Sequence, residues 1–361
     1  MIPITDSRVS AYTIPTQTPE SDGTLEWNST TIVIVEVRAG AASGVGYSYG
    51  HKAVATLIDD SLLPLINGRS ATDVAGTWVA MCRAVRNNGR SGLSAMAIAA
   101  VDAALWDLKA RLLEVPVATL LGAVRDTVPV YGSGGFTSYS IEELQRQLAG
   151  WVDRGIRMVK MKIGRDPQAD GSRVRSAREA IGPATALFVD ANGAYDAEQA
   201  VRQAEQFAAF DVTWFEEPVS SDDTNGLRLV RQRKPAGMDI AAGEYGYTVY
   251  DFRRLLETGA VDVVQADATR CGGISGFLQA AALCDAFNMP MSAHTAPALH
   301  THVCCAMPRV RHIEYFHDHQ RIERLLFDGV PEPVDGSLRP DLSRPGFGFE
   351  LKRADAQRYA A

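Results

Sequence analysis

The chain has 361 residues, of which 46% are hydrophobic and 22% charged, enough for one large domain with an appendage or for two domains. A formal net charge of −7 gives no basic surface, which argues against nucleic acid or an anionic membrane as the main partner. Five cysteines without paired metal-ligand spacing, and the lack of a signal sequence or a bilayer-length apolar stretch, favour a cytoplasmic protein.

The first part of the chain has its own pattern. Residues 31–38 alternate between apolar and polar side chains, as a half-buried strand does. The glycine-rich residues 40–50 are expected to turn the chain, and residues 91–113 carry a long apolar helical pattern. We therefore expect residues 1–128 to form an α+β capping domain.

After residue 128, short apolar strands alternate with amphipathic helices, which is typical of βαβ units and a parallel sheet. Eight candidate strands end at residues 130–135, 159–164, 187–193, 214–218, 240–246, 263–273, 291–296 and 313–316. An α/β fold with a TIM-type (β/α) barrel over residues 129–330 is the simplest closure, with the active site at the C-terminal strand ends. Residues 331–361 lack this rhythm and are expected to pack back on the capping domain.

Two lysines lie on one candidate strand. Because side chains two apart in a strand share a face, Lys160 and Lys162 are expected to project into the barrel, with Val159, Met161 and Ile163 facing the helices. Two converging ammonium groups in a partly dry barrel are expected to lower at least one pKa, which supplies a neutral amine as a base. The alternative is a solvated strand face, which fits poorly with a barrel interior.

Three acidic residues, Asp190, Glu216 and Glu244, end successive candidate strands. Carboxylate oxygens with open coordination positions suit an octahedral Mg²⁺. Any one of these residues could instead be a helix N-cap or a salt-bridge partner, but the repetition at one point of three βα units favours one Mg²⁺ per subunit. Glu217 is expected to point away from Glu216 by strand alternation.

Asp267 and His294 end two adjacent candidate strands, so their side chains can meet. A carboxylate on one imidazole nitrogen would fix the tautomer and raise the basicity of the other nitrogen, although a structural histidine is the alternative. Glu314 ends the last strand and could donate a hydrogen bond to a substrate carboxylate if burial keeps it protonated; a salt bridge at the rim is the alternative. His317 and His319 are expected in a solvated loop, with a position at the barrel mouth as the alternative.

These residues together resemble the mandelate racemase subgroup of the enolase superfamily, whose members use Lys or His bases with Mg²⁺. The resemblance rests on KMK at 160–162, DAN at 190–192, EEP at 216–218, GE at 243–244, the Asp267–His294 pair and Glu314, with PGFGFEL at 345–351 resembling the family's closing segment. It covers nearly the whole chain. It implies a capping domain and a modified barrel.

The resemblance also implies a role for each matching residue. Mg²⁺ would bind to Asp190, Glu216 and Glu244. Lys162 and His294 would be opposed acid–base groups, tuned by Lys160 and Asp267, with Glu314 as an electrophilic donor. Ser133 and Asn192 match positions that contact substrate. The subgroups that lactonise muconate or epimerise dipeptides carry a lysine in place of Asp267, and mandelate racemase has lysine in place of Arg270, whose contacts the sequence leaves open.

The implied reaction is removal of the proton α to a carboxylate. Dehydration of a sugar acid to a 2-keto-3-deoxy acid is the leading expectation, because the capping segments offer polar side chains suited to a polyol: Thr16, Thr18, Tyr47, Ser48, Tyr49 and His51. Tyr47 and His51 are the expected substrate contacts among them. Racemisation of a 2-hydroxy acid and a non-catalytic protein on the same scaffold are the alternatives. The expected partners are a small-molecule carboxylate and further copies of the chain in a homo-oligomer.

Overall fold

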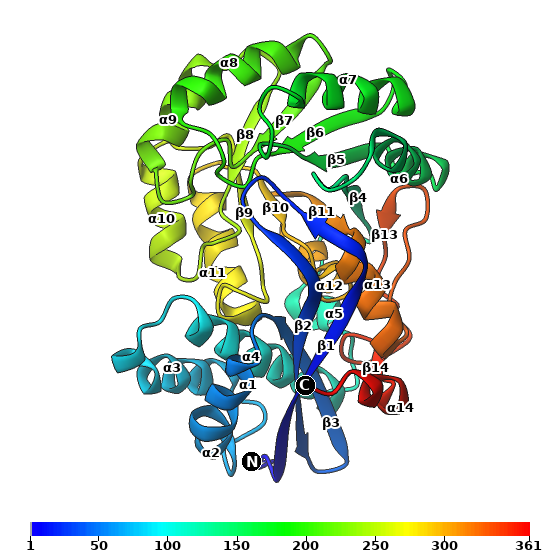
Figure 1. Ribbon diagram of the computed structural model, residues 1–361. Coiled ribbons are helices and arrows are strands. Elements are labelled where there is room, and N and C mark those ends of the chain that lie inside the picture. The colour runs from blue at the N-terminus through cyan, green and yellow to red at the C-terminus, as the bar shows by residue number, and fades with distance from the viewer. Residues whose placement is uncertain (1) are drawn as a thin grey trace.

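The computed structural model describes residues 2–361 and divides into a mixed α/β cap and a barrel (Figure 1). The cap opens with an antiparallel sheet in the order β1 (Asp6–Ser21), β2 (Glu26–Ala39) and β3 (Ala42–Tyr49). Its helical part comprises α1 (Ala53–Leu57), a π-helix (Ile58–Leu62), α2 (Leu63–Ile66), α3 (Val74–Ala84), a 3-10 turn (Arg86–Asn88), α4 (Leu93–Leu112) and α5 (Val117–Leu121). No helix within residues 2–361 has the length and apolarity to span a membrane.

The predicted strand and helix of this part correspond to β2 and α4, but the expectation of a turn over residues 40–50 is wrong. Only residues 40 and 41 turn, and the rest is mostly strand β3. The glycines serve packing instead. A Cβ on Gly44 would lie 2.3 Å from the carbonyl oxygen of Ala104, and one on Gly46 would lie 2.2 Å from the Ala104 nitrogen. Only glycine therefore allows α4 to approach β3 this closely.

The second part is a closed eight-stranded parallel barrel, as predicted. Neighbouring strands pair in chain order, and the last pairs with the first. The strands are β4 (Val128–Gly134), β5 (Met158–Lys162), β6 (Ala186–Asp190), β7 (Val212–Glu216), β8 (Asp239–Ala242), β9 (Val263–Ala266), β10 (Met291–Ala293) and β11 (Val310–Phe316). The helices that follow them are α6 (Ile141–Asp153), α7 (Asp170–Ile181), α8 (Ala197–Ala208), α9 (Thr224–Arg233), α10 (Val249–Glu257), α11 (Gly273–Ala286), α12 (Pro297–Cys305) and α13 (His317–Leu326).

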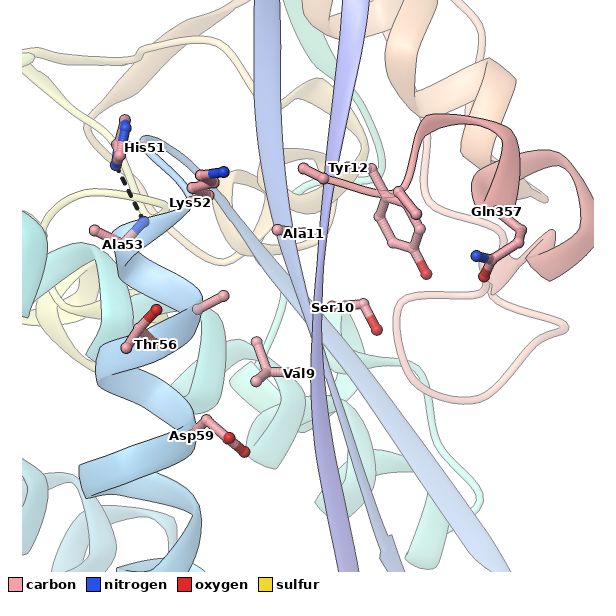
Figure 2. Close-up of a pocket in the computed structure, with 13 residues that line it drawn as sticks. Val9, Ser10, Ala11, Tyr12, His51, Lys52, Ala53, Thr56, Asp59 and Gln357 are labelled. Atoms are coloured by element: carbon pink, nitrogen blue, oxygen red, sulfur yellow. Dashed lines mark hydrogen bonds between the residues drawn. The ribbon is translucent and has the colours of Figure 1, made fainter.

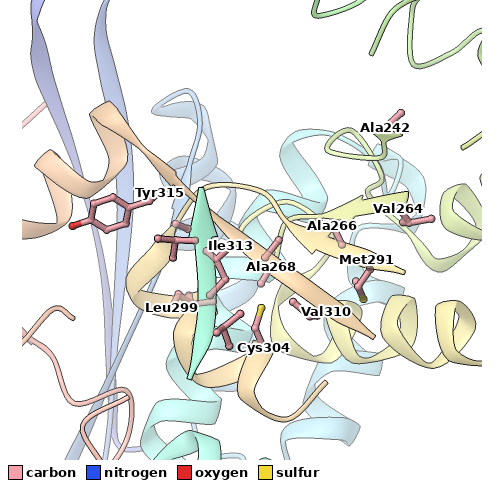
Figure 3. Close-up of a cluster of buried hydrophobic side chains, with 14 of the residues drawn as sticks. Ala242, Val264, Ala266, Ala268, Met291, Leu299, Cys304, Val310, Ile313 and Tyr315 are labelled. Atoms are coloured by element: carbon pink, nitrogen blue, oxygen red, sulfur yellow. The ribbon is translucent and has the colours of Figure 1, made fainter. Parts of the chain in front are cut away.

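An apolar layer joins the outer face of the strands to the helices. Figure 3 shows part of it, where Val264 of β9, Met291 of β10 and Ile313 of β11 gather with Leu299 and Cys304 of α12. All five are buried. Each of the Val, Met, Ile and Leu side chains in this layer contributes roughly 1.5–3 kcal/mol to folding when fully buried. This layer fixes the strands and therefore the positions of their C-terminal ends.

A second layer fills the barrel interior below those ends. It consists of Tyr131, Phe188, Trp214, Ala241 and Val263. Three of these residues precede a polar residue of the rim by two positions. Because side chains two apart share a face of a strand, Ser133, Asp190 and Glu216 stand directly above this aromatic floor.

The terminal segment contacts both parts. Its elements are β12 (Phe327–Asp328), β13 (Ser337–Leu338), β14 (Glu350–Leu351), α14 (Arg353–Ala356) and a 3-10 turn (Gln357–Tyr359). The backbone nitrogen of Phe347 donates to Asp107 of α4 at 2.7 Å, so this part of the segment contacts the cap. Strand β13, however, pairs antiparallel with β4 of the barrel.

Candidate active site

Three carboxylates from successive strand ends meet at one point. Asp190, Glu216 and Glu244 each offer a carboxylate oxygen, and these oxygens lie within 4.8 Å of one another. All three residues are at most 3% exposed. Within residues 2–361, Glu244 Oε2 is buried without a hydrogen-bond partner. An orphaned, buried carboxylate oxygen beside two other acidic groups fits a hard divalent cation.

The lysines of β5 face these carboxylates. Lys160 Nζ lies 2.5 Å from Glu216 Oε1, 2.9 Å from Glu314 Oε1 and 3.4 Å from Asp190 Oδ2. Lys162 Nζ lies 2.5 Å from Asp190 Oδ2. Both side chains therefore project into the barrel, as strand alternation predicts.

The expectation of a lowered lysine pKa is wrong for this arrangement. Burial by itself lowers the pKa of Lys162, but the attraction of Asp190 outweighs it and raises that pKa. Burial likewise lowers the pKa of Lys160, whereas Glu216 and Glu314 raise it well above its ordinary value. Sequence reasoning counted the two ammonium groups and not the carboxylates that surround them.

His294 stands across the site from the lysines and is oriented by Asp267. Its Nδ1 lies 2.9 Å from Asp267 Oδ2, and its Nε2 lies 3.3 Å from Glu244 Oε2. Asp267 is held in turn by Thr269, whose backbone nitrogen and hydroxyl both donate to Oδ1 at 2.7 Å. Burial raises the pKa of Asp267, but the hydrogen bond from His294 and its charge lower it below the ordinary value. The arrangement directs Nε2 toward the triad.

Glu314 lies in the same cluster, but it is not a proton donor as the side chains stand. Its Oε1 accepts from the Ser133 hydroxyl at 2.6 Å, and its Oε2 accepts from the Thr295 nitrogen at 3.2 Å. Burial raises its pKa, but the ammonium of Lys160 and the His294 ring lower that pKa below its ordinary value. The expected protonated carboxyl is therefore corrected to a carboxylate paired with Lys160.

The loop after β6 and the residue after β7 also face the site. Asn192 adopts φ +47° and donates its backbone nitrogen to Asp190 Oδ1 at 2.9 Å, while its own Oδ1 has no partner within residues 2–361. Glu217 was expected to point away. It takes φ +37°, which breaks the strand alternation, and it is 1% exposed. Burial and the neighbouring Glu244 carboxylate raise the pKa of Glu217 well above its ordinary value.

Two expected substrate contacts from the cap lie elsewhere. The Tyr47 hydroxyl donates to Glu323 Oε1 at 2.5 Å, and its ring packs on Phe327 in the apolar core. His51 is exposed and lines a broad groove of about 810 Å³ between β1, α1 and the chain end, where its Nδ1 accepts from the Ala53 nitrogen (Figure 2). Neither side chain joins the cluster. Tyr47 shares a face of β3 with Tyr49 but is bound to Glu323 in the core, and His51 lies beyond the end of the strand.

The cap instead contributes Tyr49, and the barrel contributes His319. Their rings stack with centroids 3.5 Å apart. His319 is 8% exposed, so the expected solvated loop is wrong at this residue. Burial and the charge of nearby His294 lower the pKa of His319 to about 3. Helix α13 begins directly after β11, so no loop carries the residue into solvent.

The turn between β1 and β2 lies over the barrel rim (Figure 1). A Cβ on Gly23 would lie 2.3 Å from the carbonyl oxygen of Ala191, so the turn touches the loop after β6. The hydroxyls of Ser21 and Thr137 are 2.6 Å apart, and Thr24 Oγ1 donates to the Asn192 carbonyl at 3.4 Å. The cap therefore closes the cluster from above.

Comparison with known families agrees with this geometry. Residues 8–122 match the mandelate racemase / muconate lactonizing enzyme N-terminal domain, and residues 143–356 match the enolase C-terminal domain-like family. The chain belongs to the enolase superfamily, within its mandelate racemase subgroup.

Individual relatives cover almost the whole chain. A mandelate racemase/muconate lactonizing enzyme-like protein from Rubrobacter xylanophilus has 53% sequence identity and a TM-score of 0.97, over 99% of both chains. The 3,6-anhydro-alpha-L-galactonate cycloisomerase of Streptomyces coelicolor is 34% identical over 95% of this chain and 96% of that protein.

The structure of a third relative contains Mg. The L-talarate/galactarate dehydratase of Salmonella typhimurium is 33% identical over 95% of this chain and 88% of that protein. Its structure with Mg and L-lyxarohydroxamate has a TM-score of 0.91, over 99% of this chain and 93% of that one. The cofactor of the present enzyme is Mg²⁺, for which Asp190, Glu216 and Glu244 form a suitable buried triad.

Proposed function

We propose that this enzyme dehydrates a sugar acid, an aldonate or aldarate, to a 2-keto-3-deoxy acid. The observation that carries the proposal is the opposition of Lys162 and His294. Lys162 contacts Asp190, and His294 contacts Glu244. The two groups therefore lie against different carboxylates of the same acidic triad. A substrate carboxylate held at the triad would place its α-carbon between an amine and an imidazole.

The proton α to a carboxylate is weakly acidic because its loss creates a second negative charge on the same group. Bound Mg²⁺ would offset two of the three negative charges of the triad and polarise the substrate carboxylate. Lys160, fixed between Glu216 and Glu314, supplies a positive charge that is already in place when the new charge develops. The cap excludes water and thereby strengthens these interactions.

Elimination then needs two proton transfers on opposite sides of the substrate. One of the two groups takes the α-proton: His294, or Lys162 once a cation at Asp190 offsets the carboxylate charge that raises the pKa of Lys162. The electron pair forms the double bond as the β-carbon–oxygen bond breaks. The other group gives a proton to the leaving hydroxyl, which departs as water. The resulting enol becomes the ketone when solvent protonates the third carbon. Tyr49, Asn192 and Ser133 are the proposed contacts for the polyol.

Two other outcomes use the same first step. If the second group returns the proton to the α-carbon, the product is a racemised 2-hydroxy acid. If the leaving oxygen belongs to a ring of the substrate, it stays attached and the reaction is an isomerisation. The 34% identity to a cycloisomerase is the observation that favours this second candidate.

A substrate screen separates these outcomes. Five- and six-carbon aldonates, aldarates and anhydro acids are incubated with enzyme and Mg²⁺, and keto products are detected as semicarbazones. In deuterated water, the dehydration product should carry deuterium on the third carbon. Loss of one water in the mass spectrum distinguishes dehydration from isomerisation. A library without keto product, together with enzyme-dependent inversion of lactate or mandelate, would overturn the proposal.

A further inference from the structure

Arg270, in the loop between β9 and α11, touches both halves of the site. Its Nη1 donates to Glu244 Oε1 at 3.1 Å and to the Glu244 carbonyl at 3.2 Å. Its Nε lies 3.7 Å from Asp267 Oδ2. The guanidinium also stands over the Tyr245 ring, 5.0 Å from the centroid. One cation thus contacts a member of the acidic triad and the carboxylate that orients His294.

These contacts close a ring of four side chains. Arg270 donates to Oε1 of Glu244 and makes no hydrogen bond with Oε2. This second oxygen lies 3.3 Å from His294 Nε2. Asp267 Oδ2 faces both Arg270 and His294 Nδ1. A carboxylate that could rotate would offer a cation either oxygen or both. The fixed, planar fork of the guanidinium removes that freedom.

The backbone of this loop is anchored from the cap. The Ser48 hydroxyl donates to the Thr269 carbonyl at 2.6 Å, and Trp78 Nε1 donates to the Gly272 carbonyl at 2.7 Å. Arg270 is therefore held on both sides along the chain, and its side chain is only 20% exposed.

We propose that Arg270 is a positioning residue that sets Glu244 for Mg²⁺ and His294 for the substrate at the same time. The role of Arg270 in positioning His294 rests on the proposed function, whereas its role in positioning Glu244 does not. A lysine here would carry the charge as a single compact ammonium and could not span Glu244 and Asp267 together.

The first test measures Mg²⁺ binding to metal-stripped protein by calorimetry, without substrate. Arg270→Gln should bind Mg²⁺ on the order of 10- to 100-fold more weakly than wild type, and Arg270→Lys should fall between them. Arg111→Gln is the matched control. Arg111 is also largely buried, at 14% exposed, and pairs with buried Asp107, but it lies at the C-terminal end of α4 and contacts no residue of the metal site. It should keep wild-type affinity whatever its melting temperature. Wild-type affinity in Arg270→Gln would overturn the proposal.

The second test uses chemical rescue. Methylguanidine should restore Mg²⁺ affinity to Arg270→Ala, and methylammonium should restore it less. At saturating Mg²⁺, Arg270→Lys should retain a reduced kcat because the guanidinium no longer spans Glu244 and Asp267, and Asp267 is the carboxylate that orients His294. A wild-type kcat in Arg270→Lys would show that Arg270 does not position His294. A lowered melting temperature with no rescue of affinity would make Arg270 merely structural. If no substrate is found, the binding measurements still decide the Mg²⁺ half.

Discussion

Trp214 shows how a neighbour two positions away prepares a functional side chain. Its Nε1 donates to Glu216 Oε2 at 2.9 Å, while Glu216 Oε1 faces Lys160 at 2.5 Å. Both residues share the inner face of β7 because strand side chains alternate. The carboxylate thus has a fixed orientation before any cation binds, which reduces the entropy lost on binding.

Removal of the Glu216 charge should therefore weaken metal binding strongly without unfolding the chain. Glu216→Gln keeps the size of the side chain and the acceptor for Trp214, and we expect Mg²⁺ affinity to fall on the order of 100-fold or more. Calorimetry measures the affinity, and circular dichroism checks the fold. Chelator should abolish wild-type turnover, and added Mg²⁺ should restore it. Full turnover in excess chelator would contradict the metal assignment.

The opposed acid–base groups make a second residue-scale prediction. Lys162→Ala and His294→Asn should each lower kcat by roughly 10²- to 10⁴-fold, because each removes one of two required proton transfers. Exchange of the α-proton in deuterated water, followed by NMR, should persist in only one variant and so identify the base. Exposed Lys52→Ala is the control. Near wild-type rates in both variants would show that other groups move the protons.

At the scale of elements, the contact of α4 with β3 depends on the missing side chains of Gly44 and Gly46. Gly44→Ala should lower the free energy of unfolding by about 1–3 kcal/mol, because its Cβ would overlap the backbone of Ala104. Gly150→Ala in α6 is the matched control. Nothing lies within 4 Å of its added Cβ, so it should stabilise the protein by up to about 1 kcal/mol. Melting temperatures that change in the same direction for both would refute the packing argument.

At the scale of the whole molecule, the cap and the barrel share buried polar contacts. Asp102 of α4 accepts from the Ser275 nitrogen at 2.9 Å and from its hydroxyl at 2.7 Å, at the start of α11. Burial raises the pKa of Asp102 to about 7, and the hydrogen bonds from Ser275 reduce that rise. This carboxyl therefore makes the seam between cap and barrel sensitive to pH.

The sign of this effect follows from proton binding. Between pH ~4 and ~7 the folded protein holds the Asp102 proton and the unfolded chain has lost it, so this contribution to stability falls as pH rises through that window. Asp102→Asn cannot titrate. The melting temperature of wild type relative to this variant should thus decline from pH 5 to pH 8, as calorimetric scans would show. A constant difference across that range would mean that Asp102 is ionised throughout.

The sequence by itself determined the barrel and the chemical types at its rim. Strand alternation and the repeat of βα units are local properties, so Lys160, Asp190 and Glu216 could be assigned to one face of successive strands before their distances were known. The charge state of these groups could not be obtained this way. The pKa values of Lys162 and Glu314 depend on carboxylates and ammonium groups that come from other strands, and only closure of the barrel brings these together.

Tertiary structure also decided what the cap contributes. In the segment GVGYSYGH, Tyr47, Tyr49 and His51 are equally suited to a polyol, yet one enters the core, one stacks on His319 and one faces a surface groove. Tyr47 and Tyr49 share the face of β3 opposite the glycines that contact α4, so their different neighbours depend on where each lies along the strand, whereas His51 follows the end of the strand. Local pattern thus specifies residue types and spacing, whereas contacts between distant segments specify the neighbours that tune and position them.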